Sequence, residues 1–135
     1  MKYPTEPMNW LESVNTMCGA GDPAMKEGLG IHVYAFNQNM AKTATYSSDG
    51  DILIVPQEGK LYITTEFGRM TVKPREICVI QRGIKYKIDL DPTVEQVNHE
   101  SAKARGYFVE VYGQHFVIPD GGPIGANSLA NPMHF

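Results

Sequence analysis

Hydrophobic and polar side chains alternate in short runs along residues 49–83, and glycine or proline separates the runs. Runs of this kind are typical of short antiparallel strands. Four strands are expected here, at Ile52–Val55, Leu61–Phe67, Met70–Lys73 and Ile77–Gln81. The last run is apolar at every position from 77 to 80, which predicts a strand covered on both faces.

The same alternation recurs on both sides of this central unit. It predicts further strands at Ile31–Phe36, Thr43–Tyr46, Ile84–Leu90, Tyr107–Tyr112 and His115–Ile118. Between 84 and 90 the polar positions are Lys85, Lys87 and Asp89, so this strand is expected to have one face in solvent. Roughly eight short strands with turn residues between them predict an all-β fold, a double-sheet jelly roll of the antiparallel β-sandwich type.

The remaining segments lack a clear alternation. Residues 1–9 carry two prolines and are expected to form an extended strap over the fold. Residues 10–17 suit a turn or two of helix or an irregular packed segment, and residues 19–22 suit a tight turn. Residues 91–103 are more polar, with a short surface helix possible after Asp91. The expected division is a β-sandwich domain at 1–118 and a Gly/Pro-rich outgoing linker at 119–135.

Length and composition limit the class of protein. A chain of 135 residues, 42% hydrophobic and 20% charged, suits one globular domain with a buried core. The formal charge of −3 argues against a nucleic-acid partner, because such binding needs clustered Lys and Arg. No apolar run approaches the roughly 20 residues of a membrane span, and no secretory signal is visible at Met1. Two cysteines, Cys18 and Cys78, make no disulfide framework, so a cytoplasmic protein is expected.

The order of turns and strands across 49–83 resembles the core of a cupin, a small double-sheet jelly roll. Cupins usually hold iron or another metal with a His-x-His, Glu and His set. The resemblance puts those places at Tyr46, Ser48, Ile52 and Val79. Iron prefers imidazole and carboxylate ligands, which none of these side chains supplies. The resemblance therefore implies a cupin frame without its metal site.

Histidines elsewhere allow a different metal hypothesis. His32 and His115 with Glu110 would provide the two imidazoles and one carboxylate that suit non-haem iron. No pair of histidines has a recognised ligand spacing, however. The favoured interpretation is that His32 and His115 are strand residues, hydrogen-bonded at the surface or at an interface.

Three other candidates have simpler structural explanations. Cys18 lacks a basic neighbour or helix start that would make a thiolate reactive, so a structural thiol is favoured. Asp49 and Asp51 lack the further oxygen ligands of a calcium site and suit a turn. Glu66 and Glu76 could form an acid–base pair, but both adjoin turn residues and are expected in solvent.

The strands contain more aromatic residues than are needed to fill one face of a small β-sandwich. The residues concerned are Tyr34, Phe36, Tyr46, Tyr62, Phe108 and Tyr112. They either fill the second sheet or meet another domain or subunit, and the glycine-rich tail favours the second alternative.

Six blocks in order closely resemble the homogentisate 1,2-dioxygenase family. They are CGAGD at 18–22, GLGIHV at 28–33, YSSDGDILIVPQEGKL at 46–61, TEFGRMTVKPREICVIQRG at 65–83, RGYFVEVYGQHF at 105–116 and PIGANSLANP at 123–132. The likeness runs from about residue 10 to the end and is weakest at 91–103. Several independent blocks in the same order are far more specific than one motif.

The resemblance implies an enzyme that opens the ring of homogentisate with O₂ to give maleylacetoacetate, a step in tyrosine and phenylalanine breakdown. Family members hold Fe(II) with two histidines and one glutamate, use another histidine in acid–base chemistry, and assemble as hexamers, each a dimer of trimers. Those catalytic and metal-binding residues lie in the C-terminal half of the family. Within 1–135 the resemblance therefore assigns no catalytic, cofactor-binding or metal residue, and no Fe(II) is expected to bind this span.

Three hypotheses follow. The chain is the N-terminal, metal-free part of the dioxygenase, serving as scaffold and subunit contact and inactive in isolation. Alternatively, it is a stand-alone cupin-like module for binding or assembly, without catalysis. The third hypothesis is a small iron cupin that uses His32 and His115.

Overall fold

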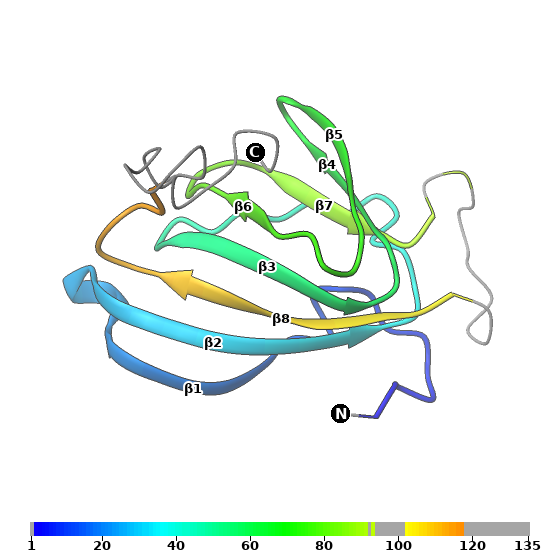
Figure 1. Cartoon of the computed structure of the whole chain (residues 1–135), viewed down its shortest axis with the longest axis horizontal. Helices are drawn as coiled ribbons and strands as arrows, with labels where there is room; N and C mark the ends of the chain where they lie inside the picture. The colour runs from blue at the N-terminus through cyan, green and yellow to red at the C-terminus, as the bar shows by residue number, and fades with distance from the viewer. Residues whose placement is uncertain (1, 92, 94–101, 118–135) are drawn as a thin grey trace, which may run out of the picture.

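The computed structural model describes residues 2–91, 93 and 102–117, which form two antiparallel sheets (Figure 1). The five-stranded sheet has the order β1-β2-β8-β3-β6 and the three-stranded sheet the order β5-β4-β7. The strands are β1 (Asn15–Asp22), β2 (Glu27–Phe36), β3 (Asp51–Glu58), β4 (Leu61–Thr65), β5 (Gly68–Val72), β6 (Cys78–Ile80), β7 (Tyr86–Asp89) and β8 (Ala104–Val111). The predicted all-β, double-sheet arrangement is confirmed. Among the described residues, no helix has the length and apolar character needed to cross a membrane.

Strand β1 is the element that the sequence pattern does not predict. Residues 10–13 do form a hydrogen-bonded turn, but residues 15–22 pair along β2 instead of forming helix and tight turn. The actual reversal is the 3₁₀ turn η1 (Pro23–Met25), where the Asp22 carboxylate accepts from the Ala24 N–H at 2.9 Å. All eight residues of β1 are exposed, and its glycines and alanine give no alternation to detect.

Several predicted strand ends also differ. Residues 43–46 contribute only one isolated bridge, between Thr45 and Tyr86, and residues 115–117 form no strand. Strand β4 ends at Thr65, which leaves Phe67 in the following turn with 82% of its surface exposed. The expected helix after Asp91 and the expected linker at 119–135 lie outside the described residues, apart from Thr93.

The N-terminal segment lies along the end of β2, where the Asn37 side chain holds it. Asn37 donates to the carbonyl groups of Pro4 at 3.3 Å and Glu6 at 3.1 Å, and its Oδ1 accepts from the Met8 N–H at 2.9 Å. The Met8 carbonyl in turn accepts from the backbone N–H groups of Asn37 and Gln38. These hydrogen bonds fix the segment that precedes Trp10, whose side chain lies in the interior.

Trp10 is the centre of an aromatic core between the two sheets. Its ring centroid lies 5.3 Å from that of Phe108, 5.7 Å from Tyr86 and 6.1 Å from Tyr34, and only 1% of its surface is exposed. Such tilted and edge-on ring pairs add to the free energy gained by burying the rings. Phe36 is fully buried beside Tyr34, at 6.0 Å between centroids.

The aromatic residues therefore fill the interior in most cases, contrary to the favoured expectation of an external contact. Tyr34, Phe36, Phe108 and Tyr112 are buried. Tyr46, by contrast, is 56% exposed, and Tyr62 is half-buried. Trp10 accounts for the buried aromatic residues, because its ring enters between the sheets and packs against aromatic side chains from both.

Asp89 is buried, although it occupies a position that the pattern places in solvent. Its Oδ1 accepts from the Met40 backbone N–H at 3.0 Å and its Oδ2 lies 2.8 Å from the Lys87 ammonium. A buried carboxylate is tolerated because both of its oxygens have partners. This contact ties the segment after β2 to β7.

A second buried carboxylate, Asp51, joins three segments of the chain. Its Oδ1 accepts from the Arg82 backbone N–H at 3.0 Å and from Arg82 Nε at 2.9 Å, and its Oδ2 lies 2.8 Å from His115 Nδ1. The Arg82 guanidinium also donates to the carbonyl groups of Tyr112 and Gln114. Burial by itself raises the pKa of Asp51, but the hydrogen bonds and charge of Arg82 and the bond from His115 outweigh it and lower the pKa.

The effect of replacing Asp51 on the free energy of unfolding should depend on pH. The unfolded carboxyl has a pKa of about 3.9, and the folded value is lower, so ionised Asp51 stabilises the fold above that pH. The contribution is lost as pH falls through the folded pKa. We expect Asp51→Asn to lower the free energy of unfolding at neutral pH by about 3 kcal/mol, measured by urea denaturation, with the difference shrinking in acid. The exposed Asp49→Asn is the matched control, and an unchanging difference from neutral pH into acid would contradict the assignment.

Truncating the central tryptophan should destabilise the whole sandwich. Trp10→Ala is expected to cost about 4 kcal/mol, because it removes a fully buried ring and leaves a cavity. The neighbouring Leu11 is 46% exposed, so Leu11→Ala should cost less than about 1 kcal/mol. Thermal and urea unfolding of the two variants would test this difference; equal losses would contradict a core centred on Trp10.

Candidate functional site

A group of polar residues on the inner face of the five-stranded sheet is carried mainly by β2 and β8. His32 on β2 and Glu110 on β8 point to the inner face, where His32 Nε2 lies 3.6 Å from Glu110 Oε2. Ser47, in the loop before β3, donates to Glu110 Oε1 at 2.5 Å. Thr16 Oγ1 lies 2.9 Å from His32 Nδ1, and the imidazole stacks on Phe108 with centroids 4.7 Å apart.

A glycine allows this group to assemble. A Cβ on Gly30 would lie 2.8 Å from both His32 Nε2 and the Tyr112 hydroxyl, so a larger residue there would displace one of them. Burial, followed by the charges of Glu110 and Asp49, raises the pKa of Tyr112. The phenol is therefore neutral beside the carboxylate at ordinary pH.

Glu110 also lines a cleft of about 260 Å³ between the N-terminal segment, the loop before β3 and the inner face of the sheets. Trp10, Phe108 and Tyr86 form its aromatic walls. Burial, and then the charge of Glu110, raises the pKa of Tyr86. The Trp10 indole N–H is buried without a hydrogen-bond acceptor among the described residues. The cleft thus combines aromatic walls with two carboxylates, Asp49 and Glu110, and with the Ser47 hydroxyl that is bonded to Glu110.

The four cupin ligand places carry side chains unsuited to iron. Ile52 is buried in the core, while Tyr46, Ser48 and Val79 are exposed. Throughout residues 2–91, 93 and 102–117, no three His, Cys, Asp or Glu side chains gather as a metal site would require.

The alternative set of His32, His115 and Glu110 is divided between two places. His32 lies beside Glu110, whereas His115 is 63% exposed at its side chain and bonds to Asp51. Asp51 itself is the residue that sequence reasoning missed, since it was assigned to a simple turn. Its partner Arg82 lies 31 residues further along the chain, and no local pattern links the two.

The remaining candidates lie apart from this interior group. Cys18 is exposed on β1, and Cys78 is buried, as expected of a small hydrophobic residue in a strand. Glu66 and Glu76 are both exposed, and their carboxylates accept from the backbone N–H groups of Lys85 and Lys73. Neither glutamate forms an acid–base pair in this structure.

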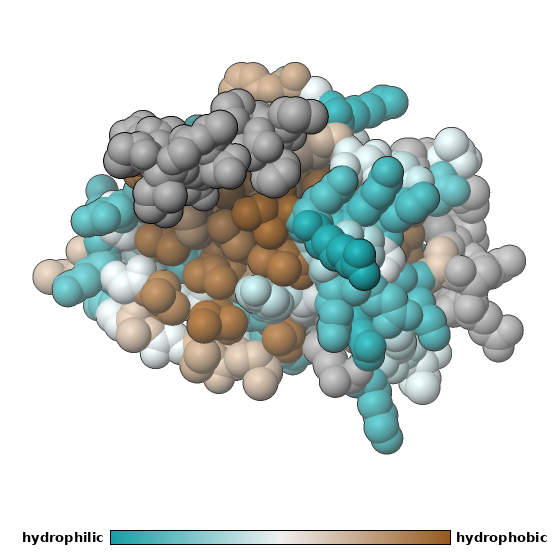
Figure 2. All heavy atoms as spheres, viewed as in Figure 1, coloured by the Kyte–Doolittle hydropathy of each residue, from teal (hydrophilic) through white to brown (hydrophobic). Residues whose placement is uncertain are grey.

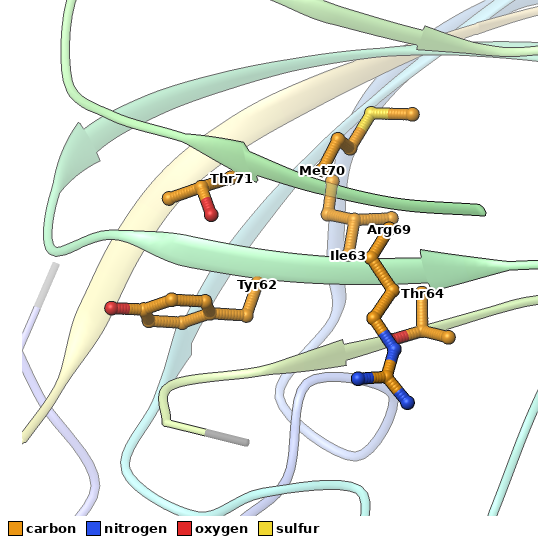
Figure 3. A pocket seen from close by; sticks show the side chains of 6 residues that line it. All are labelled: Tyr62, Ile63, Thr64, Arg69, Met70 and Thr71. Atoms are coloured by element: carbon orange, nitrogen blue, oxygen red, sulfur yellow. The ribbon is translucent and has the colours of Figure 1, made fainter. Parts of the chain in front are cut away.

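A second, shallow hollow of about 210 Å³ lies on the β4–β5 hairpin. Figure 3 shows Tyr62 and Thr64 from β4 and Arg69 and Thr71 from β5 at its sides, with Met70 extending away from Arg69. Arg69 is the only ionisable group besides the Tyr62 phenol among the residues that line it. Those residues do not form a recognisable catalytic set.

Known structures with the same fold include cupins. A cupin-2 domain protein from Shewanella frigidimarina matches with a TM-score of 0.55 and 15% identity, covering 78% of this chain and 84% of that one. The Cnp3 cupin domain of Schizosaccharomyces pombe matches with a TM-score of 0.56 and 14% identity, covering 73% and 59%. At such low identity these likenesses show the cupin fold alone.

Sequence relatives are far more similar. Homogentisate 1,2-dioxygenase of Drosophila melanogaster is 54% identical over 128 residues, which is 95% of this chain and 27% of the relative. The human enzyme of the same name is 50% identical, with coverage of 95% and 26%, and that of Dictyostelium discoideum is 49% identical, with 96% and 28%. The chain thus spans about a quarter of the length of these relatives.

A family model described as "Homogentisate 1,2-dioxygenase N-terminal" matches residues 1–135, the whole of the chain. Together with identities near one half along 95% of the chain, this match confirms the resemblance found in the sequence blocks. The chain belongs to the homogentisate 1,2-dioxygenase N-terminal family.

Proposed function

We propose that this chain serves as the N-terminal jelly-roll domain of an enzyme that opens the ring of homogentisate with O₂ to give maleylacetoacetate. The observation that carries the proposal is the family match along residues 1–135. The relatives that bear the enzyme's name come from an insect, a mammal and a slime mould, and each aligns with nearly the whole chain.

The proposed role of this span is to support the enzyme and contact other subunits. Fe(II) in oxygenases of this kind prefers two imidazoles and a carboxylate with open positions beside them. In the described residues, His32 and Glu110 make a pair with no third donor, and Glu110 is already bonded to Ser47. These residues do not fit an iron site, so the iron ligands are proposed to lie in polypeptide outside this span, and no reaction step is assigned to the residues named here.

The same proposal includes assembly and location. We propose a homo-oligomer, a hexamer built as a dimer of trimers, in the cytoplasm. The two cysteines support a reducing compartment, because neither forms a disulfide and Cys18 is exposed. The proposed domain ends at 118 and is followed by a linker at 119–135.

A chimera can test whether the domain supports catalysis. Residues 1–135 would replace the matching segment of the Drosophila melanogaster enzyme, and O₂ uptake with homogentisate and ferrous iron would be recorded. The chimera should consume O₂ in a homogentisate-dependent way, because the inserted domain preserves the family fold. The 135-residue chain alone should show no uptake above that of ferrous iron in buffer; uptake by the isolated chain would contradict the proposal. A folded but inactive chimera would also count against it.

The histidines of this span should be dispensable for iron binding. In the same chimera, His32→Asn and His115→Asn should leave the iron content per subunit unchanged, because neither imidazole belongs to a three-donor site among the described residues. Iron would be measured by mass spectrometry after metal loading and desalting, with circular dichroism as the check on folding. A stoichiometric loss of iron in either folded variant would favour the hypothesis of an iron cupin instead.

A further inference from the structure

Glu110 is a largely enclosed carboxylate that forms no ion pair with a lysine or arginine among the described residues. Only 17% of its side chain is exposed. The two fully buried carboxylates each have a cation beside them, because Asp51 lies 2.9 Å from Arg82 Nε and Asp89 lies 2.8 Å from Lys87 Nζ. An enclosed charge without a counter-charge costs free energy. Glu110 is therefore a place where a cation from outside the chain would be stabilised.

One oxygen of Glu110 has no hydrogen-bond donor among the described residues. Oε1 accepts from Ser47, whereas the neighbouring His32 Nε2 lies 3.6 Å from Oε2. That separation is too long for a hydrogen bond, and His32 Nε2 is itself buried without a partner among the described residues. The other imidazole nitrogen, Nδ1, is occupied by Thr16 Oγ1 at 2.9 Å. Glu110 Oε2 can therefore accept from a group that enters through the cleft.

Asp49 adds a second carboxylate to the same cleft. The loop that carries it packs on Glu110, since a Cβ on Gly50 would lie 3.1 Å from Glu110 Cγ. Burial, then the charge of Glu110 and then that of Asp49, raises the pKa of Tyr112, so both charges act on one phenol. The residues that line the cleft include no lysine, arginine or histidine. The cleft is therefore negatively charged at neutral pH.

The remainder of the cleft is largely apolar. Its aromatic walls are Trp10, Tyr86 and Phe108. Leu11 and Tyr46 also line it and are 46% and 56% exposed, which places them toward the mouth. The volume of about 260 Å³ is just below the roughly 300–1,000 Å³ of sites for drug-sized molecules. The cleft thus suits a smaller organic molecule with an apolar body.

The hydrophobic surface elsewhere does not offer the same chemistry. Figure 2 shows brown, hydrophobic residues gathered over β2, β8 and β3, with teal, hydrophilic residues beside them. At one end of β3 and β8, Glu58 is paired with Arg105 at 3.1 Å, so the charge of this carboxylate is already matched. An apolar surface with matched charges selects no class of ligand. The cleft does so, because it combines apolar walls with unmatched carboxylates.

We propose that the cleft binds a small primary amine with an apolar body. An alkylammonium group carries a positive charge at neutral pH and has three N–H donors. Its donors are directed to Glu110 Oε2 and to the Asp49 carboxylate, and its apolar body covers Leu11 and Tyr46 at the mouth. The aromatic walls favour a cation further, through its attraction to the ring faces. The inference concerns a binding site within this span and does not rest on the proposed dioxygenase function.

Benzylammonium is a suitable probe, and the single tryptophan of the chain is the reporter. The 135-residue chain would be titrated in amine-free phosphate buffer at neutral pH with benzylammonium, benzyl alcohol and benzoate, which are similar in shape and differ in charge. Binding would be followed by Trp10 fluorescence and by the one indole N–H resonance in ¹⁵N spectra. Benzylammonium should bind about tenfold more tightly than benzyl alcohol, because charge-assisted hydrogen bonds are the stronger ones. Benzoate should give no saturable change.

Two substitutions test whether the carboxylates hold the amine. Glu110→Gln preserves the shape of the side chain and should weaken benzylammonium binding about tenfold, with benzyl alcohol unaffected. Asp49→Asn, in the exposed loop, should weaken it about threefold and keeps the test decisive if Glu110→Gln fails to fold. Glu27→Gln removes the same charge from the exposed start of β2 and should bind as the unaltered chain does. Circular dichroism would establish that each variant is folded.

Equal affinities for benzylammonium and benzyl alcohol would overturn the proposal, because the cleft would then select for apolar character alone. So would the absence of a saturable change with benzylammonium, or an affinity that the folded carboxylate variants leave unchanged. The activity test fails separately. An active chimera together with a chain that does not bind benzylammonium would reject the amine site and leave the proposed function standing, whereas binding together with an inactive, folded chimera would do the reverse.

Discussion

The structure depends on the pairing of β8 with both β2 and β3. Strand β8 is the last strand of the described chain, yet it lies in the middle of the five-stranded sheet, with β1 and β2 on one side and β3 and β6 on the other. The two halves of the sheet therefore join only when β8 is in place. Such non-local pairing carries a loop-closure cost before its contacts form. Phe108 and Glu110 on one face, and Val109 on the other, acquire their neighbours through this one strand.

Aromatic packing occupies much of the space inside this jelly roll. Trp10 enters from the segment before β1, and its contacts with Tyr34, Tyr86 and Phe108 connect the two sheets. The polar remainder of the interior is small, with His32 and Glu110 held in place by Thr16 and Ser47. Glu110 Oε1 accepts from Ser47, whereas His32 Nε2, 3.6 Å from Glu110 Oε2, is buried without a hydrogen-bond partner among the described residues.

The sequence predicts those elements whose side chains alternate between core and solvent. Strands β2, β3, β4 and β8 were found in this way, because buried residues such as Ile54 and Phe108 recur at every second position. Strand β1 has no such signal, since its small and polar residues are exposed on both sides and only hydrogen bonds to β2 define it. The amino-acid composition of a strand cannot reveal that strand when its formation depends only on hydrogen bonds to a neighbouring strand.

The candidate site was less predictable than the fold, for the same reason. The sequence predicts that Asp51 and Asp89 are exposed to solvent, because charged side chains are seldom buried. Their burial depends on Arg82, His115 and the Met40 backbone N–H, which approach only in the folded chain. The family resemblance identified the cupin fold and the four positions that lack iron ligands. It could not predict that His32 and His115 lie apart, because their partners, Glu110 and Asp51, are distant in the sequence.

Successive side chains of a strand point to opposite faces, so one strand can specify folding and assembly separately. In β3, Ile52 and Ile54 belong to the core, while Leu53 and Val55 are half-buried on the opposite face of the sheet. A substitution on the outer positions changes the surface available for contact and leaves the core intact. Change at the outer positions therefore alters the surface of the sheet without loss of the fold, provided that the register of β8 between β2 and β3 is kept. The constraint on the inner positions is to fill a fixed volume around Trp10.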